Sequence, residues 1–314
     1  MDAITPQDGH VLVIGASGTD VVGRAQTFLQ AGTSTPGQVR VSHGGVARNV
    51  AENLARLGME TILITAVGED APGRQLLLQA SQSGVNVDYA LAAEGFQSGS
   101  YVAMLDEAGS LHLALDDMRV IDAITSQYLR DCQPLFRRAA AIVLDANLPP
   151  RTLKTAVSLA GRAKVPIAAD PTSVALAPRL APHLEKLWLV TPNEAEAEAL
   201  CPHPVPHADR EIALDAARHL VSEGVDIAII TMAEYGVGYA TTEVSGHVPA
   251  MPTTIVDPTG AGDALTAAVI FALLNDIPID EAVRLGVSAA YLTLRTPGSV
   301  VPDLSLEVLY DQLR

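Results

Sequence analysis

The sequence is short of cysteine and of long hydrophobic runs, and each shortage excludes a class of protein. Its two cysteines, Cys132 and Cys201, can supply neither a disulfide framework nor a set of thiolate metal ligands. We expect both to be free thiols in a cytoplasmic protein. No apolar run approaches the roughly 18 residues of a membrane-spanning helix. Residues 1–10 lack the charged-then-apolar pattern of a signal peptide.

Positive charge is also scarce, because 20 Lys and Arg stand against 36 Asp and Glu, for a formal net charge of -16. A protein that binds nucleic acid through its phosphates needs a basic patch, and the sequence has no Lys/Arg cluster. We therefore expect a small-molecule ligand, with no nucleic-acid polymer and no membrane as partner.

What the sequence does contain is a regular alternation of short apolar runs and helical stretches. The stretch 46–57, for example, has helical periodicity and stops at Gly58. Such repeats predict an α/β fold, a mostly parallel central sheet with helices on both faces, in a single domain over 1–314. The predicted strands are 11–14, 61–65, 140–144, 167–169, 187–190 and 227–230.

Two stretches break this alternation and predict a small antiparallel β lid. Residues 38–41 alternate polar and apolar side chains, and 100–115 is typical of a hairpin with its turn at 106–109. We expect a lid built from about 16–43 and 97–118 that closes over a ligand and excludes water. An edge extension of the main sheet is the alternative, and a homodimer through the exposed lid strands is a further expectation.

The most informative run is Asp-Pro-Thr-Gly-Ala-Gly-Asp-Ala at 257–264. Gly260 and Gly262 leave room for an anion, and the apolar stretch 264–274 predicts a helix whose N-terminus attracts negative charge. Asp263 would repel such an anion, so it needs a chemical reason. We interpret it as a general base that takes the proton of a hydroxyl attacking a held phosphate.

A second motif, Gly44-Gly45, precedes the predicted helix 46–57, and Asn49 falls on the first turn of that helix. The glycines allow close approach of the backbone to a ligand, and Asn49 offers both a donor and an acceptor. Alone, the Gly-Gly pair is equally consistent with a tight turn.

Together, the runs 44–51 and 257–264 resemble the two signatures of the ribokinase-like (PfkB) sugar and nucleoside kinases. The resemblance extends over essentially the whole chain. It implies a three-layer αβα kinase fold that uses ATP and Mg²⁺, with Asp263 as the base and the N–H groups of the glycine loop holding the transferring phosphoryl group. The implied phosphoryl-binding residues are Gly260, Ala261 and Gly262, and the implied acceptor-binding residues are Asp20, Gly44, Gly45, Asn49 and Ser100.

The resemblance also implies a nucleotide and metal side. Its residues are Asn193, Glu196 (which would hold Mg²⁺ through water), Thr231 and Gly236, beside Gly260 and Gly262. Asp257 and the Thr259 carbonyl resemble a monovalent-cation site of some members, which implies stimulation by K⁺.

Simpler structural roles stay open for several of these residues. Asp20 fits a turn or a helix cap, Asn193 and Glu196 fit a capping box, and Asp257 fits a brace of the glycine loop without an ion. Asp145 and Asp170 follow predicted strands, where ligands of open α/β sheets gather.

One departure from the family pattern concerns the nucleotide. The family has Thr-x-Gly-x-x-Gly where this chain has Thr-Met-Ala-Glu-Tyr-Gly at 231–236. Ala233 adds a methyl group and Glu234 a negative charge, so we expect an altered nucleotide affinity or base preference.

The acceptor is suggested by further resemblance. The runs 37–49, 100–106, 116–118 and 301–305 are similar to those of bacterial pseudouridine kinases, which implies phosphorylation of the 5′-hydroxyl of pseudouridine. Alternatives are a kinase for another nucleoside or for a ribose- or fructose-like sugar, and a binding regulator without turnover, against which Asp263 argues. An oxidoreductase is disfavoured, because 15–20 lacks the full Gly-x-Gly-x-x-Gly fingerprint.

Overall fold

The computed structural model describes residues 9–313, and an eight-stranded sheet lies at its centre. Six strands run parallel, and β13 and β14 are added antiparallel at one edge. Residues 1–8, which make up most of the segment expected to lack a signal peptide, lie outside the described residues. In sheet order the strands are β14 (Ser245–Val248), β13 (Val237–Thr241), β12 (Ile227–Thr231), β11 (Leu189–Val190), β10 (Ile167–Asp170), β9 (Ala139–Asp145), β1 (His10–Ile14) and β4 (Thr61–Ile64).

Helices cover both faces of this sheet, as the repeated βα pattern predicts. Side chains of β1 alternate between two buried clusters: Val11 and Val13 pack with α1, α8 and α9, while Leu12 and Ile14 pack with α5 and α7. A strand buried on both faces must be apolar throughout, which explains the continuous hydrophobic runs. The helices are α1 (Val46–Arg56), α2 (Ala71–Gln82), α3 (Ser126–Asp131), α4 (Gln133–Arg138), α5 (Pro150–Ala163), α6 (Glu194–Leu200), α7 (Arg210–Ser222), α8 (Ala261–Leu274), α9 (Ile279–Leu294) and α10 (Leu306–Asp311).

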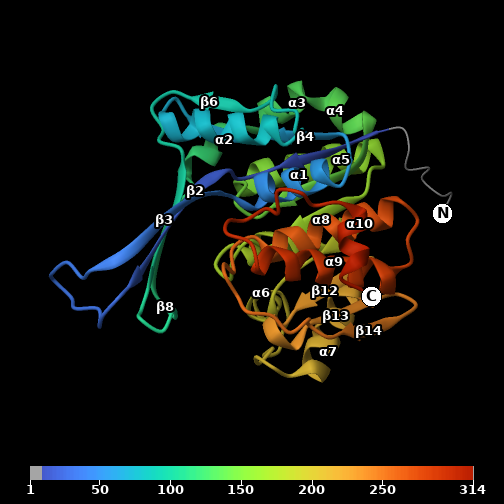
Figure 1. Cartoon of the computed structure of the whole chain (residues 1–314). Coiled ribbons are helices and arrows are strands. Elements are labelled where there is room, and N and C mark those ends of the chain that lie inside the picture. The colour runs from blue at the N-terminus through green and yellow to red at the C-terminus, as the bar shows by residue number, and fades with distance from the viewer. Residues whose placement is uncertain (1–8, 314) are drawn as a thin grey trace.

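A smaller sheet projects from this body, with β2, β3 and β8 visible at its side in Figure 1. Its outer ladders, β2–β3 and β7–β8, are antiparallel as predicted, and its central ladder, β2–β7, is parallel. This sheet is called the lid below. Its strands, in sheet order, are β3 (Gly37–Gly44), β2 (Gly18–Ala25), β7 (Gly99–Leu105) and β8 (Leu111–Asp117).

The lid has two chemically different faces. Register places Val21, Val41 and Val102 side by side on the outer face, and Asp20, Ser42 and Tyr101 side by side on the inner face. The outer face is apolar and exposed. Its exposed large side chains are Val39, Val41, Val102, Met104, Leu113 and Leu115.

Two further findings bear on the sequence expectations. Both cysteines are free thiols. None of the helices in the described part of the chain combines the length and the apolar character that crossing a membrane requires. A third sheet of two short strands, β5 (Ala66–Gly68) and β6 (Leu91–Ala93), completes the described strands.

Candidate active site

The start of α8 forms the centre of the site. The helix begins at Ala261, three residues earlier than the apolar stretch predicts, so Asp263 lies in its first turn. Gly260 precedes it with φ 79°, and a side chain there would meet the Ser299 carbonyl oxygen at 2.2 Å. Gly262 is exposed, with no atom near its Cβ position. The first N–H groups of a helix have no intrahelical acceptor, so this turn can receive an anion.

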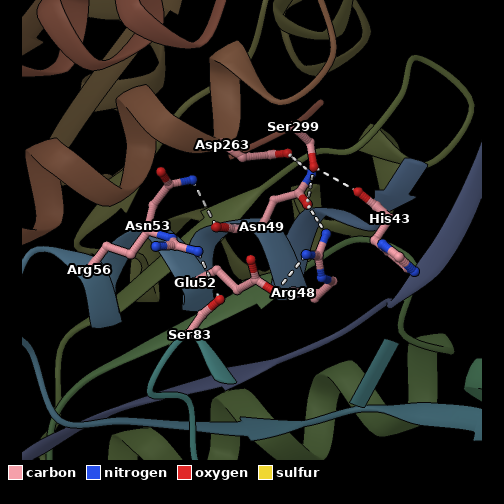
Figure 2. Close-up of polar contacts among 9 residues, drawn as sticks. All are labelled: His43, Arg48, Asn49, Glu52, Asn53, Arg56, Ser83, Asp263 and Ser299. Carbon is pink, nitrogen blue, oxygen red and sulfur yellow. Dashed lines mark hydrogen bonds and ion pairs between the residues drawn. The ribbon is translucent and has the colours of Figure 1, made fainter. Parts of the chain in front are cut away.

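Asn49 and Asp263 meet where α1 and α8 cross. Asn49 Nδ2 donates to Asp263 Oδ2 at 2.7 Å, and Asn49 Oδ1 accepts from Arg48 Nη1 at 3.1 Å. Ser299 Oγ lies 2.9 Å from Asn49 Oδ1 and 2.7 Å from the His43 carbonyl oxygen, so one hydroxyl is shared between two acceptors. Figure 2 shows these side chains converging on Asn49. Because Arg48 and Ser299 both contact Asn49 Oδ1, the amide nitrogen of Asn49 is left facing Asp263.

Asp263 is held in a setting that favours its neutral form. Desolvation raises the pKa of Asp263 to about 7 against the hydrogen bond from Asn49, with help from the charges of Asp145, Asp20 and Glu196. A carboxyl group with a pKa near 7 has the property of a general base that works near neutral pH.

The two upstream glycines are required by close packing, Gly44 against Asp20 and Gly45 against the backbone of Ala16 and Ser17. A side chain at Gly44 would come within 2.1 Å of Asp20 Oδ2, and Gly45 has φ 97° with its Cβ position 2.6 Å from the Ala16 carbonyl oxygen. Asp20 lies inside β2, where it is buried, and is neither a turn residue nor a helix cap. Desolvation raises the pKa of Asp20 to about 6, and the charge of Arg48 opposes that rise.

Ser100 does not share a face of the lid with Asp20. Register pairs Ser100 with Thr19 and pairs Asp20 with Tyr101, so alternation places Ser100 on the opposite side. Asp116, paired with Tyr101 across β7 and β8, lies on the same face as Asp20. Tyr101 and Asp116 therefore lie on the same face of the lid as Asp20, and neither was predicted as a site residue.

On the nucleotide side, Asn193 caps α6 and forms the expected capping box. Its Oδ1 accepts from Glu196 N–H at 2.9 Å, and Glu196 Oε2 accepts from Asn193 N–H at 3.0 Å. Thr231 is bridged to Asn193, so these residues lie together at the ends of β11 and β12. The capping role leaves Glu196 Oε1 for another partner.

The carboxylates in this region match the chemistry of Mg²⁺. Burial raises the pKa of Asp170 well above its usual value, and the charges of Asp263 and Glu196 add to the rise. Desolvation likewise raises the pKa of Glu196. Among the described residues no group of three or more His, Cys, Asp or Glu side chains is placed to hold a metal ion directly, so these carboxylates fit Mg²⁺ through its waters, which it keeps readily.

The departure at 231–236 has a visible structural effect. Ala233 adopts φ 45°, in the left-handed region that a Cβ disfavours, and Gly236 adopts φ 96° with its Cβ position 2.2 Å from the Val248 carbonyl oxygen. The Glu234 side chain is 68% exposed and lies 3.9 Å from His207 Nε2. Its charge therefore faces the surface and a histidine.

Asp257 is fully buried and braces the glycine loop. Its Oδ1 accepts from Thr259 N–H at 3.0 Å, its Oδ2 accepts from Gly298 N–H at 2.9 Å, and Arg40 of the lid forms an ion pair with it. The cation expected here from the resemblance stays a prediction.

Comparison with known proteins identifies the class of this site. The model of the pfkB family of carbohydrate kinases matches residues 8–305. The chain belongs to this family. It is a PfkB-family sugar or nucleoside kinase, a phosphotransferase with an alcohol group as acceptor.

Three relatives place the chain within the PfkB family. It is 34% identical over 298 residues to the pseudouridine kinase of Escherichia coli (strain K12), covering 95% of this chain and 94% of the relative. It is 28% identical to the guanosine-inosine kinase of Exiguobacterium acetylicum, covering 94% of this chain and 97% of the relative. The Arabidopsis thaliana ribokinase solved with ribose and ATP superposes with a TM-score of 0.85 at 21% identity, covering 98% of this chain and 99% of that one. The superposition confirms the predicted three-layer fold with its small β sheet.

The structure adds two residues to the candidate site that the sequence predictions did not include. Ser299 follows α9, and Arg40 precedes the first motif by four residues, within the run 37–49, for which the resemblance implied no role of its own. Both reach the site through contacts between segments distant in the chain, which a local pattern does not reveal.

Proposed function

We propose that this kinase transfers the γ-phosphate of ATP to the 5′-hydroxyl of pseudouridine, giving pseudouridine 5′-phosphate. The observation that carries the proposal is the similarity to the Escherichia coli pseudouridine kinase, at 34% identity over nearly the full length of both chains. The chemistry of the site supports the transfer step, and the lid supports a nucleoside acceptor.

Asp263 takes the proton of the acceptor hydroxyl as that oxygen attacks the γ-phosphorus, the bond from the γ-phosphorus to the bridging oxygen breaks, and ADP leaves. The acceptor hydroxyl replaces Asn49 as the partner of Asp263, and Asn49, still held through its oxygen by Arg48, is free to bond the sugar. The N–H groups of Gly260, Ala261 and Gly262 receive the negative charge of the transferring group. No covalent enzyme intermediate is needed.

ATP and Mg²⁺ belong on the side of Asn193, Glu196, Thr231 and Gly236. When bound, Mg²⁺ neutralises charge on the phosphates. Glu196 would hold it through water, because Mg²⁺ keeps several of its waters near phosphates. Ala233 places a methyl group at φ 45° in the turn proposed to lie against the nucleotide, where the resemblance implies a glycine.

The uracil ring is read by the inner face of the lid. Ser42, Tyr101 and Asp116 present hydroxyl and carboxylate groups on that face, beside Asp20. A ring with both N–H donors and carbonyl acceptors needs such mixed partners. A bare sugar leaves these groups unmatched, which favours a nucleoside over ribose or fructose.

The outer face of the lid supports a homodimer. Val41 and Leu115 are 64% and 68% exposed, and they belong to an apolar face that spans all four lid strands. Apolar patches of this kind mark interfaces. We expect a dimer in sedimentation, which Leu115→Glu dissociates and Val174→Glu, an exposed apolar site on the body, leaves intact. A monomeric wild type at tens of micromolar would refute the interface.

The acceptor is tested by an ATP-coupled assay with pseudouridine, uridine, guanosine, inosine, adenosine, ribose and fructose. We expect the highest kcat/KM for pseudouridine. A preference for guanosine or inosine would favour the second candidate, a purine nucleoside kinase. The 28% identity to the guanosine-inosine kinase supports this candidate. A preference for a free sugar would reject both nucleoside assignments.

A further inference from the structure

Arg40 connects the lid to the glycine loop of the kinase site. It lies in β3, between Val39 and Val41, whose side chains are exposed on the outer face. Alternation therefore directs Arg40 to the inner face, toward the body. There its guanidinium forms an ion pair with Asp257, far away in the sequence.

Asp257 needs a positive partner because it is fully buried. An ionised carboxylate without compensation is strongly disfavoured in the interior of a protein. Within residues 9–313, the ion pair found for Asp257 is the one with Arg40, and two backbone N–H groups, from Thr259 and Gly298, complete its hydrogen bonds. The carboxylate is thus satisfied by the chain itself.

The residues present do not fit a resident monovalent cation while Arg40 holds this position. The cation would share one buried carboxylate with a guanidinium whose side chain is 38% exposed, and the two positive charges would repel each other. Arg40 also acts on Asp20, whose pKa its charge lowers against the effect of burial. One side chain therefore serves both carboxylates.

We propose that Arg40 takes the place of a monovalent cation at Asp257, fastens the base of the lid to the glycine loop, and makes this kinase independent of K⁺. Arg40 is a positioning residue. It acts through Asp257, which holds the N–H groups of Thr259 and Gly298 on either side of the place where Gly260 packs against Ser299. Ser299 in turn contacts Asn49. The inference rests on the kinase activity and holds for whichever acceptor the panel selects.

The test compares K⁺, Na⁺ and tetramethylammonium chloride at constant ionic strength in the wild type, Arg40→Gln and Arg40→Lys. Rates and melting temperatures are both measured, so cation binding has a readout besides turnover. The matched control is Arg24→Gln, a lid arginine that contacts the Glu107 carbonyl oxygen instead of the loop. Guanidinium chloride at low millimolar concentration is added to test for chemical rescue.

We expect wild-type rates and melting temperatures to differ by less than about twofold and about one degree between the salts, since screening is equal. Arg40→Gln should lose roughly tenfold or more in kcat/KM, because Asp257 loses its buried partner. That variant should then gain rate and melting temperature with K⁺ over tetramethylammonium, and should regain rate with guanidinium. Arg24→Gln should behave as the wild type.

Stimulation of the wild type by K⁺ of several fold would overturn the proposal, as would an Arg40→Gln variant with unchanged rate and melting temperature. If Arg40→Gln does not fold, Arg40→Lys carries the test, and a K⁺ requirement in that variant also counts against the proposal. An error in the acceptor assignment would appear in the substrate panel and not in this test. Every ratio of rates between salts or variants is measured with the acceptor that the wild type prefers.

Discussion

Asn49 Nδ2 lies 2.7 Å from Asp263 Oδ2, so the amide expected to hold the acceptor is bonded to the expected base. The two roles are compatible because a carboxylate oxygen that accepts from an amide is already aimed at the place where a hydroxyl proton must arrive. On the proposed mechanism, binding of the acceptor would exchange one donor to Asp263 for another and leave the direction of the carboxylate unchanged.

The Asp263→Asn variant should lose turnover by about 10²-fold or more, the usual effect of removing a positioned base. Acceptor binding should change little, since Asn keeps the size of the side chain. Steady-state kinetics with separate calorimetric binding measures both. Asp303→Asn, an exposed carboxylate, serves as control. Turnover near that of the wild type would remove Asp263 from the mechanism.

The pH profile of the free enzyme should follow the ionisation of Asp263. Desolvation raises its pKa to about 7, and the base acts only when ionised, so kcat/KM should rise with pH up to about 7 and then level off. Asp263→Asn should lack this rise in its residual activity. A profile already flat between about pH 5 and 8 would show that another group limits the rate.

The same ionisation should lower stability at high pH. The pKa of Asp263 is 3.8 when unperturbed and about 7 in the fold, so the neutral form is favoured in the folded state. Its stabilising contribution is present below 3.8 and is lost as pH rises through about 7. Without ATP and Mg²⁺, Asp263→Asn should therefore gain in melting temperature over the wild type from about pH 5 to pH 8. A constant difference would contradict this linkage.

Arg48 should matter for stability through its buried ion pair. Its side chain is 4% exposed and that of Glu52 is 3% exposed, and Arg48 Nη2 lies 2.5 Å from Glu52 Oε1. Arg48→Met should cost about 3–5 kcal/mol in urea unfolding, because Glu52 becomes an uncompensated buried charge. The double variant Arg48→Met/Glu52→Leu should recover most of this loss. Equal losses in both variants would argue that the pair's charge is not the cause.

Ala233→Gly should stabilise the turn beside the nucleotide. Ala233 has φ 45°, which strains a residue with a Cβ by about 1–2 kcal/mol, and glycine would relieve this strain. Part of the gain in stability is lost, because glycine has a larger conformational entropy in the unfolded state. We expect a rise in melting temperature and a lower KM for ATP. Ala163→Gly, at the end of α5, is the control and should lower the melting temperature. An unchanged KM would separate this turn from nucleotide binding.

The sequence predicts this fold well where a pattern is local. Buried runs such as Val11–Ile14 predicted the parallel strands, and the glycine loop with the apolar stretch after it predicted the helix α8. The strand β2 was not predicted, because Gly18–Ala25 carries two glycines and a weak alternation, and pairing on both sides holds it extended. Ser299 and Arg40 were not predicted as site residues for a related reason, because the residues that they contact are distant in sequence.

The parallel ladder between β2 and β7 also constrains how the chain acquires its structure. A parallel pair cannot be joined by a tight turn, and here β3, α1, β4, β5, α2 and β6 lie between the two strands in the chain. The lid therefore closes as a sheet only after this intervening segment has found its place. During synthesis, β2 and β3 are made before β7, and an isolated pair of antiparallel strands is at best marginally stable. Pairing of β2 with β7 then has to complete the sheet. We therefore expect the lid sheet to be completed late in folding, because its two central strands come from either side of α1 and α2 in the chain.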